Sequence, residues 1–273
     1  MKLTIVDVFA EARYQGNQLA VVEGAAGLSD ALMQDIAREM NFSETTFVID
    51  RRDHEAEVRI FTPGEELPFA GHPTLGTAWV LTGGTKPIVL SLPAGRVPVR
   101  FDAGIGWLTP PSATAGTAIA PAAAAELLSL GESDLDPDLD AQIVHCGPTF
   151  AIVGVNSLAA LQRVHVDLAV QRRAGIAGAA FAVCRGGYSE DADFAARMLF
   201  FDGVGIREDA ATGSANAAFA HYLLARGSSG RFIVEQGFEI RRPSRIHLRI
   251  TDGIAGSIEV GGKVQPVAEG RLL

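Results

Sequence analysis

Three side chains have types and positions that suit proton transfer on a small acid. Glu44 lies in the stretch 41–48, where the other positions that share its face of an expected strand are apolar residues or threonine. His72 stands at the start of an expected helix, and Asp209 stands just ahead of another. Carboxylates and imidazoles are common proton carriers in enzymes, so these three are the candidate catalytic residues.

Two glycine-containing loops open the helices beside these side chains. They are Gly71-His72-Pro73 and Thr212-Gly213-Ser214. A helix N-terminus carries unsatisfied N–H groups and a partial positive charge, and glycine lets a ligand approach the backbone closely. We therefore expect Gly71, Gly213, Ser214 and Thr212 to bind an anionic substrate, namely a small carboxylate.

Taken singly, each candidate also has a purely structural explanation. Glu44 could be a surface carboxylate, and His72 could cap a helix. Asp209 could be an acidic residue favoured before a helix, while Thr212 and Ser214 could be N-caps without a ligand. The functional interpretation is favoured because polar groups of both loops occupy equivalent places in two halves of the chain.

Other chemistries lack their motifs. No Gly-x-Ser-x-Gly sequence surrounds Ser214, so a serine hydrolase is not indicated. The remaining histidines show no His-Glu-x-x-His spacing, and the glycine runs near 186 and 203 match no nucleotide-binding pattern. We expect no metal and no cofactor.

Composition restricts the partners and the compartment. The chain has 273 residues and a net charge of −9, which repels a phosphate backbone and argues against nucleic acid as a partner. The first residues resemble no signal peptide, and no apolar run approaches the roughly 20 residues of a membrane span. Only Cys146 and Cys184 are present, far apart, which suits a reducing compartment. We expect a cytoplasmic protein without membrane contact.

Hydrophobic periodicity predicts short strands and a few helices. In the first half we expect a helix that follows Ser29 and ends at Met40, and a second helix whose first residue is Pro73. The expected strands of this half are 3–9, 19–22, 44–49, 56–61, 88–92, 97–101 and 106–108. The Ala/Pro/Gly stretch 110–122 is the best candidate for a linker.

The second half of the chain repeats the first. Gly16 through Val22 align with Gly147 through Val153, and Glu66 and Gly71 align with Glu208 and Gly213. Chance recurrence of glycine turns is the alternative, but the matches keep their order. We expect one half at 1–112, completed by the C-terminal strand at about 263–273, and a second half at 113–262.

Several motifs together resemble the phenazine-biosynthesis isomerase (PhzF-like) family. The motifs are Glu66-Leu67-Pro68-Phe69-Ala70-Gly71-His72-Pro73 and Glu208-Asp209-Ala210-Ala211-Thr212-Gly213-Ser214, with Val6-Asp7-Val8-Phe9, Gly16-Asn17 and Phe42-Ser43-Glu44-Thr45 in support. The resemblance covers essentially the whole chain. It implies an α+β fold like that of diaminopimelate epimerase, with two pseudo-symmetric halves, each a curved, mostly antiparallel sheet around a central helix. It also implies a site between the halves and a homodimer.

The resemblance assigns roles to residues as well. Glu44 matches the acid/base carboxylate, His72, Asp209 and Ser214 match polar groups around the substrate, and Gly71 and Gly213 match loops that supply backbone N–H groups. Related racemases carry proton-transferring cysteines where this chain has Ala70 and Thr212, so thiol chemistry is disfavoured. Gln18 and Ala210 replace prolines common in the family.

The implied activity is a cofactor-independent isomerisation that shifts a proton and a double bond on a small cyclic or amino-acid-derived carboxylate. A dihydro-hydroxyanthranilate is the substrate type that the family suggests. A lyase, dehydratase or epimerase on a small hydroxy or amino acid would use the same side chains. A non-catalytic anion-binding protein is the alternative from another class, and the combination of Glu44, His72 and Asp209 argues against it.

Overall fold

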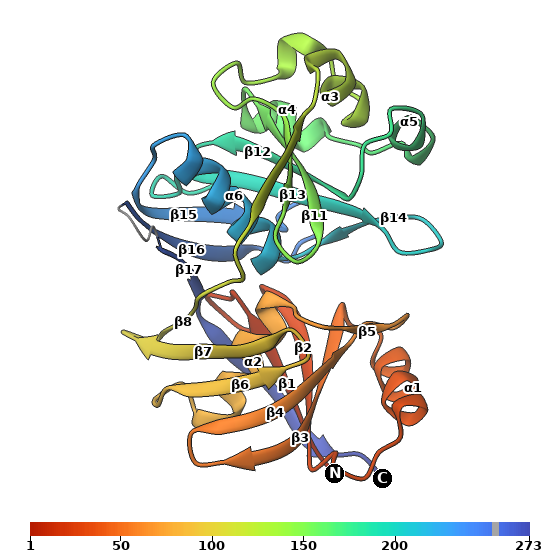
Figure 1. Ribbon diagram of the computed structural model, residues 1–273, viewed down its shortest axis with the longest axis vertical. Coiled ribbons are helices and arrows are strands. Elements are labelled where there is room, and N and C mark those ends of the chain that lie inside the picture. The colour runs from red at the N-terminus through yellow and green to blue at the C-terminus, as the bar shows by residue number, and fades with distance from the viewer. Residues whose placement is uncertain (253–256) are drawn as a thin grey trace. The chain divides into compact units, whose positions relative to one another are not determined.

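The computed structural model describes residues 1–252 and 257–273, and the chain forms two compact units within it. Unit 1 contains Met1–Thr109 and Val260–Leu273, and unit 2 contains Pro110–Glu259 (Figure 1). None of the helices in the described ranges has the length and apolar character that a membrane crossing requires.

Unit 1 is built mainly from strands, with two helices. The helices are α1 (Asp30–Met40) and α2 (Gly71–Thr82). The strands are β1 (Lys2–Val8), β2 (Asn17–Glu23), β3 (Glu44–Arg52), β4 (Glu55–Phe61), β5 (Glu66–Leu67), β6 (Ile88–Leu92), β7 (Gly95–Asp102), β8 (Ile105–Leu108) and β18 (Val264–Arg271). Strand β17 (Ser257–Gly262) reaches this unit at its end, where Val260 pairs with Leu108 of β8.

Unit 2 has a similar content with more short helices. The helices are α3 (Pro121–Leu127), the short 3-10 helix Glu132–Asp134, α4 (Leu158–Arg163), α5 (Leu168–Arg173) and α6 (Gly213–Ala225). The strands are β9 (Thr114–Ala118), β10 (Gln142–His145), β11 (Thr149–Val155), β12 (Ala179–Arg185), β13 (Phe194–Phe201), β14 (Ile206–Asp209), β15 (Gly230–Gln236) and β16 (Ser244–Thr251).

The two units pair their strands in the same order. In unit 1, β2 is parallel to β3, β3 is antiparallel to β4, and β4 pairs with both β5 and β6. In unit 2, β11 is parallel to β12, β12 is antiparallel to β13, and β13 pairs with both β14 and β15. The register of the parallel pairs is also the same. Leu19 of β2 pairs with Glu44 of β3, and Phe150 of β11 pairs with Ala179 of β12. The residue equivalent to Glu44 in unit 2 is therefore Ala179.

Helix α2 is the central element of unit 1. It is buried on nearly every side, contacts β1, β2, β6 and β8, and lies among these strands in Figure 1. Because side chains alternate along a strand, Thr46 of β3 faces α2 while Phe47 faces the opposite side. The Thr46 hydroxyl lies 2.8 Å from the Thr77 hydroxyl of α2, and Phe47 packs with Met33 and Ala37 of α1. Helices thus cover both faces of strand β3.

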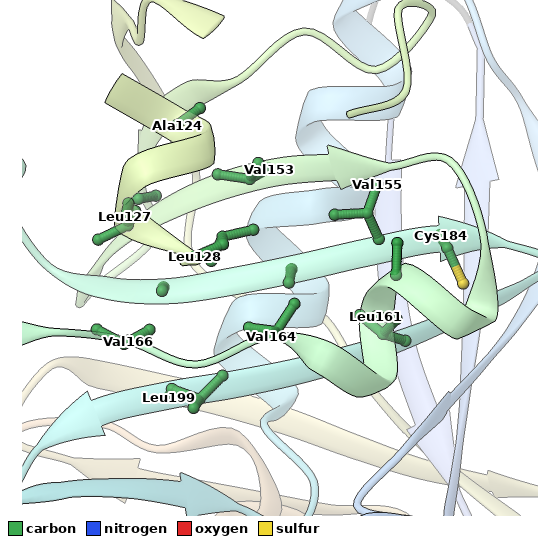
Figure 2. Packing of buried hydrophobic residues seen from close by; sticks show 14 of the residues in the cluster. Ala124, Leu127, Leu128, Val153, Val155, Leu161, Val164, Val166, Cys184 and Leu199 are labelled. Atoms are coloured by element: carbon green, nitrogen blue, oxygen red, sulfur yellow. The ribbon is translucent and has the colours of Figure 1, made fainter. Parts of the chain in front are cut away.

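Unit 2 shows the same layering with different side chains. Phe181 and Phe219 occupy the positions equivalent to Thr46 and Thr77, and their ring centroids lie 6.0 Å apart. The opposite face of β11 and β12 packs against α3 and α4 through aliphatic residues (Figure 2). Figure 2 labels Ala124, Leu127, Leu128, Val153, Val155, Leu161, Val164, Val166, Cys184 and Leu199 in this core. The two units therefore share the same layers of helix and sheet, but a pair of threonines in unit 1 is replaced by a pair of phenylalanines in unit 2.

Two local expectations differ from the structure. Helix α2 begins at Gly71 and not at Pro73, so Pro73 lies in the first turn, where a missing N–H removes no intrahelical hydrogen bond. The expected linker contains strand β9, which pairs antiparallel with β10. Strand β9 consists of alanine, glycine and threonine, without an alternation of apolar and polar residues. It is a strand because it pairs with the edge of β10. Helix α1 confirms its prediction, with Ser29 as N-cap.

Candidate functional site

Glu44 and His72 lie together in unit 1. The Glu44 Oε2 atom is 3.3 Å from His72 Nε2, and their side chains are 15% and 4% exposed. Alternation along β3 explains the approach, because Glu44 shares with Thr46 the face that packs on α2. His72 is the second residue of α2, so the imidazole lies at the start of the helix, next to the Glu44 carboxylate.

Asn17 holds the other nitrogen of the same imidazole. Its Nδ2 atom lies 3.3 Å from His72 Nδ1, and both side chains are buried. The other ring nitrogen, Nε2, faces Glu44. Burial lowers the pKa of His72 to about 3, against the effect of a hydrogen bond with the Gln18 backbone. His72 is thus uncharged at physiological pH.

The turn before Asn17 requires glycine. Gly16 has a φ of +67°, and a Cβ at this position would lie 2.3 Å from the carbonyl oxygen of Val8. Asn17 is the first residue of β2, directly after this turn. Analysis of the sequence did not identify Asn17 as a site residue, although the Gly-Asn pair was part of the recognised pattern.

The start of helix α2 offers backbone donors. Ala70 is its N-cap and makes no side-chain cap, and the first turn carries no acidic residue. Gly71 is the first helical residue and is buried. Its neighbourhood suits an anion, because the N–H groups of a first turn have no intrahelical acceptor.

The second set of expected residues gathers around the start of α6 in unit 2. Asp209 ends β14 and is 7% exposed, and its Oδ2 atom accepts a hydrogen bond of 2.6 Å from the Thr212 hydroxyl. Thr212 is the N-cap residue of α6, but its hydroxyl makes no cap because it is bonded to Asp209. Gly213 and Ser214 follow as the first residues of the helix, and both are buried. The structure therefore joins Asp209, Thr212, Gly213 and Ser214 in one unit, and Glu44, Gly71 and His72 in the other.

Gln236 was missed by the analysis of the sequence. It ends β15, is fully buried, and its amide bonds to Thr212 and to the backbone of Asp209. Lone glutamines occur throughout protein sequences, and no local motif marks this one. Only the parallel pairing of β13 with β15, which places Ala196 opposite Gln236, brings it beside β14.

The chain has two cysteines, Cys146 and Cys184. Both are buried in unit 2, and burial raises the pKa of each thiol to about 11. Among the described residues, no three His, Cys, Asp or Glu side chains gather as a metal site would require.

Residues 6–270 match the model of the PhzC-PhzF family, which is described as phenazine biosynthesis-like protein. The chain belongs to the PhzC-PhzF family. An uncharacterized isomerase of Mesorhizobium japonicum is 33% identical over 98% of this chain and 97% of its own length. The trans-2,3-dihydro-3-hydroxyanthranilate isomerase of Pseudomonas aeruginosa is 36% identical over 99% of this chain and 98% of its own. The chain is accordingly an isomerase of the PhzC-PhzF family.

Solved structures confirm the expected fold. A phenazine biosynthesis protein of the PhzF family from Bacillus anthracis superposes with a TM-score of 0.89 at 24% identity, covering 100% of this chain and 99% of its own. A probable proline racemase from Agrobacterium radiobacter gives a TM-score of 0.65 at 15% identity, covering 100% and 92% of the two chains. The fold of the PhzC-PhzF chain is therefore shared with racemases, as the family resemblance implied.

Proposed function

We propose that this protein is a cofactor-independent isomerase that shifts a proton and a double bond on a small cyclic or amino-acid-derived carboxylate of the dihydro-hydroxyanthranilate type. The observation that carries the proposal is the pair formed by the half-buried Glu44 carboxylate and the buried His72 imidazole, with Oε2 and Nε2 3.3 Å apart. A carboxylate beside a neutral imidazole supplies both a proton acceptor and a hydrogen-bond donor without a thiol, metal or organic cofactor.

In the proposed reaction Glu44 acts as base and then as acid. The ionised carboxylate takes a proton from one substrate carbon, the electron pair of that C–H bond moves into the conjugated system, and the protonated Glu44 returns the proton to another carbon. The Nε2–H group of His72 stabilises the carboxylate when it is charged. Asn17 would keep the imidazole in this tautomer through its contact with Nδ1.

The residues of the helix starts are proposed to hold and orient the substrate. Gly71 and Gly213 would offer backbone N–H groups to its carboxylate, because each is the first residue of a helix. Ser214 would add a hydroxyl, and Asp209 would orient a polar substituent and relay protons together with His72. Thr212 is the remaining residue that we expect at the substrate, and its hydroxyl and its N–H are bonded inside the protein, to Asp209 and Gln236.

The decisive experiment follows hydrogen exchange from solvent. Wild type and Glu44→Gln are incubated in deuterated water with trans-2,3-dihydro-3-hydroxyanthranilate and with a panel of dihydroaromatic and amino-acid carboxylates, and products are followed by NMR and mass spectrometry. We expect rearrangement with deuterium incorporation in wild type, and a loss of about 100-fold or more in Glu44→Gln. The matched control is Glu39→Gln, since Glu39 lies exposed on α1.

Other outcomes distinguish the alternatives. Loss of water from the substrate would indicate a lyase or dehydratase, and inversion at one carbon an epimerase. Equal exchange in wild type and Glu44→Gln would reject the assignment of Glu44, and binding without exchange in any compound would favour an anion-binding protein. Activity that survives dialysis against a chelator supports the absence of a metal.

The assembly and compartment are part of the same proposal. The family resemblance suggests a homodimer that acts in the cytoplasm on a small molecule, without nucleic acid or membrane as a partner. Light scattering after size-exclusion chromatography tests the assembly. A mass of twice 28.7 kDa supports the dimer, and a mass of 28.7 kDa contradicts it.

A further inference from the structure

The side-chain amide of Gln236 is fully bonded and has only one permitted orientation. Its Nε2 atom donates to the Asp209 carbonyl at 3.0 Å and to the Thr212 hydroxyl at 3.0 Å. Its Oε1 atom accepts from the Thr212 N–H at 3.3 Å and from Asn216 Nδ2 at 3.1 Å. A carbonyl can only accept and a backbone N–H can only donate, so these two partners exclude the flipped amide.

The orientation of Gln236 determines where the Thr212 proton points. A hydroxyl has one proton to donate, and the Thr212 oxygen already receives Nε2–H from Gln236. Its own proton therefore goes to Asp209 Oδ2, 2.6 Å away. This oxygen of Asp209 must accept, which requires it to be unprotonated. Donation from Gln236 also strengthens the bond that Thr212 donates, because chained hydrogen bonds polarise one another.

Unit 1 has no such chain of hydrogen bonds. The strand registers place Leu67, Ala70 and Leu92 at the positions equivalent to Asp209, Thr212 and Gln236. None of these three side chains carries a polar atom. The chain of hydrogen bonds is therefore a feature of one half, added to a framework that both halves share.

We propose that Gln236 and Thr212 are positioning residues that hold the Asp209 carboxylate in one orientation, with Oδ2 fixed as an acceptor. The proposal rests on the proposed function, in which Asp209 contacts the substrate. It gives Thr212 a role through Asp209 in place of direct substrate binding. Gln236 acts one step further away, because it sets the direction of the Thr212 hydroxyl.

The test removes the hydroxyl and retains the shape of the side chain. In Thr212→Val, we expect kcat to fall about tenfold to 100-fold, the range for loss of a hydrogen bond to a charged group, with KM changed less than about threefold. Thr212→Ser keeps the hydroxyl and should recover most of the lost kcat. Thr117→Val, on the exposed strand β9, is the matched control.

A double-mutant cycle separates positioning from general damage. If Thr212 acts through Asp209, Thr212→Val adds no further loss of kcat in an Asp209→Asn background. If instead the fold-losses of kcat in the two single variants multiply in the double variant, the two residues act independently and the proposal is overturned. Gln236→Met should lower kcat in the same way, with a smaller effect when the Thr212 hydroxyl is already absent.

A crystal structure of Thr212→Val gives a readout that needs no substrate. We expect the Asp209 carboxylate to rotate or to occupy two conformers, and an unmoved carboxylate would overturn the proposal even if kcat falls. Failure of the proposed function is distinguishable, because it would appear as unchanged exchange in Glu44→Gln. Loss of activity in Glu44→Gln with a wild-type kcat in Thr212→Val would reject the positioning role alone.

Discussion

Arg197 binds Glu208 through two guanidinium nitrogens, and the equivalent pair in the other unit is Arg59 with Glu66. Nη2 of Arg197 donates to Glu208 at 2.7 Å, and Nη2 of Arg59 donates to Glu66 at 2.5 Å. Each pair ties the short strand before a central helix to the strand beside it. The pairs differ in burial, with side-chain exposures of 10% and 7% for Arg197 and Glu208 against 23% and 31% for Arg59 and Glu66.

Removal of the two arginines should therefore have unequal costs. Arg197→Met leaves Glu208 buried and unpaired, so we expect the free energy of unfolding to fall by about 3–5 kcal/mol. Arg59→Met leaves Glu66 partly in water and should cost about 1 kcal/mol. Urea unfolding monitored by circular dichroism measures both. Equal losses in the two variants would contradict the assigned difference in burial.

Gly76 marks a close approach of helix α2 to the sheet. A Cβ at this position would lie 2.5 Å from Leu19 Cδ2 and 2.7 Å from Val8 Cγ2, and both of these side chains are fully buried. We expect Gly76→Ala to lower the free energy of unfolding by about 1–3 kcal/mol, the range for overpacking. Gly27→Ala is the control, because nothing lies within 4 Å of its Cβ position. Chemical unfolding in which both variants match wild type would show that the helix shifts without cost.

The cysteines should be inert and dispensable. Burial raises the pKa of Cys146 and Cys184 to about 11, so almost no thiolate exists at pH 8. We expect iodoacetamide to leave the native protein unlabelled by mass spectrometry and its activity intact. Cys146→Ala and Cys184→Ala should likewise retain kcat. Inactivation by iodoacetamide, with protection by substrate, would reverse the conclusion that no thiol carries the proton.

The sequence predicts the elements better than their contacts. Local signals make several features predictable. The N-cap Ser29 indicates the start of helix α1, and the β-branched residues after Glu44 indicate strand β3. The repeated glycine loops indicate that Gly71 and Gly213 are equivalent. Strand β9 is not predictable, because its residues do not alternate between apolar and polar and it forms only by pairing with β10. Local propensity describes a segment alone, whereas pairing depends on which edge is available.

The candidate site shows the same division. The family pattern predicts roles for Glu44, His72 and Asp209, but it does not show that His72 is uncharged or that the Thr212 hydroxyl is bonded to Asp209. Those properties come from burial and from Asn17 and Gln236, which lie far from their partners in the sequence. Charge state and hydrogen-bond direction are set by tertiary contacts, so a sequence alone cannot predict them.

His72 should make the stability of the protein depend on pH. Its pKa is about 3 in the folded protein and about 6.5 when unfolded, because burial opposes the charged form. Between these values the unfolded chain binds the additional proton, so stability falls as pH decreases from 6.5 toward 3. The slope from this one group approaches about 1.4 kcal/mol per pH unit.

Replacement of the imidazole isolates this contribution. In His72→Gln no group titrates at this position, so the loss of unfolding free energy between pH 7 and pH 4.5 should be smaller than in wild type by about 2–3 kcal/mol. Urea unfolding at both pH values measures the difference, and His54→Gln, at an exposed position, is the control. A loss as large as that of wild type would mean that His72 gains its proton without unfolding, and the imidazole could then act as a charged partner of Glu44.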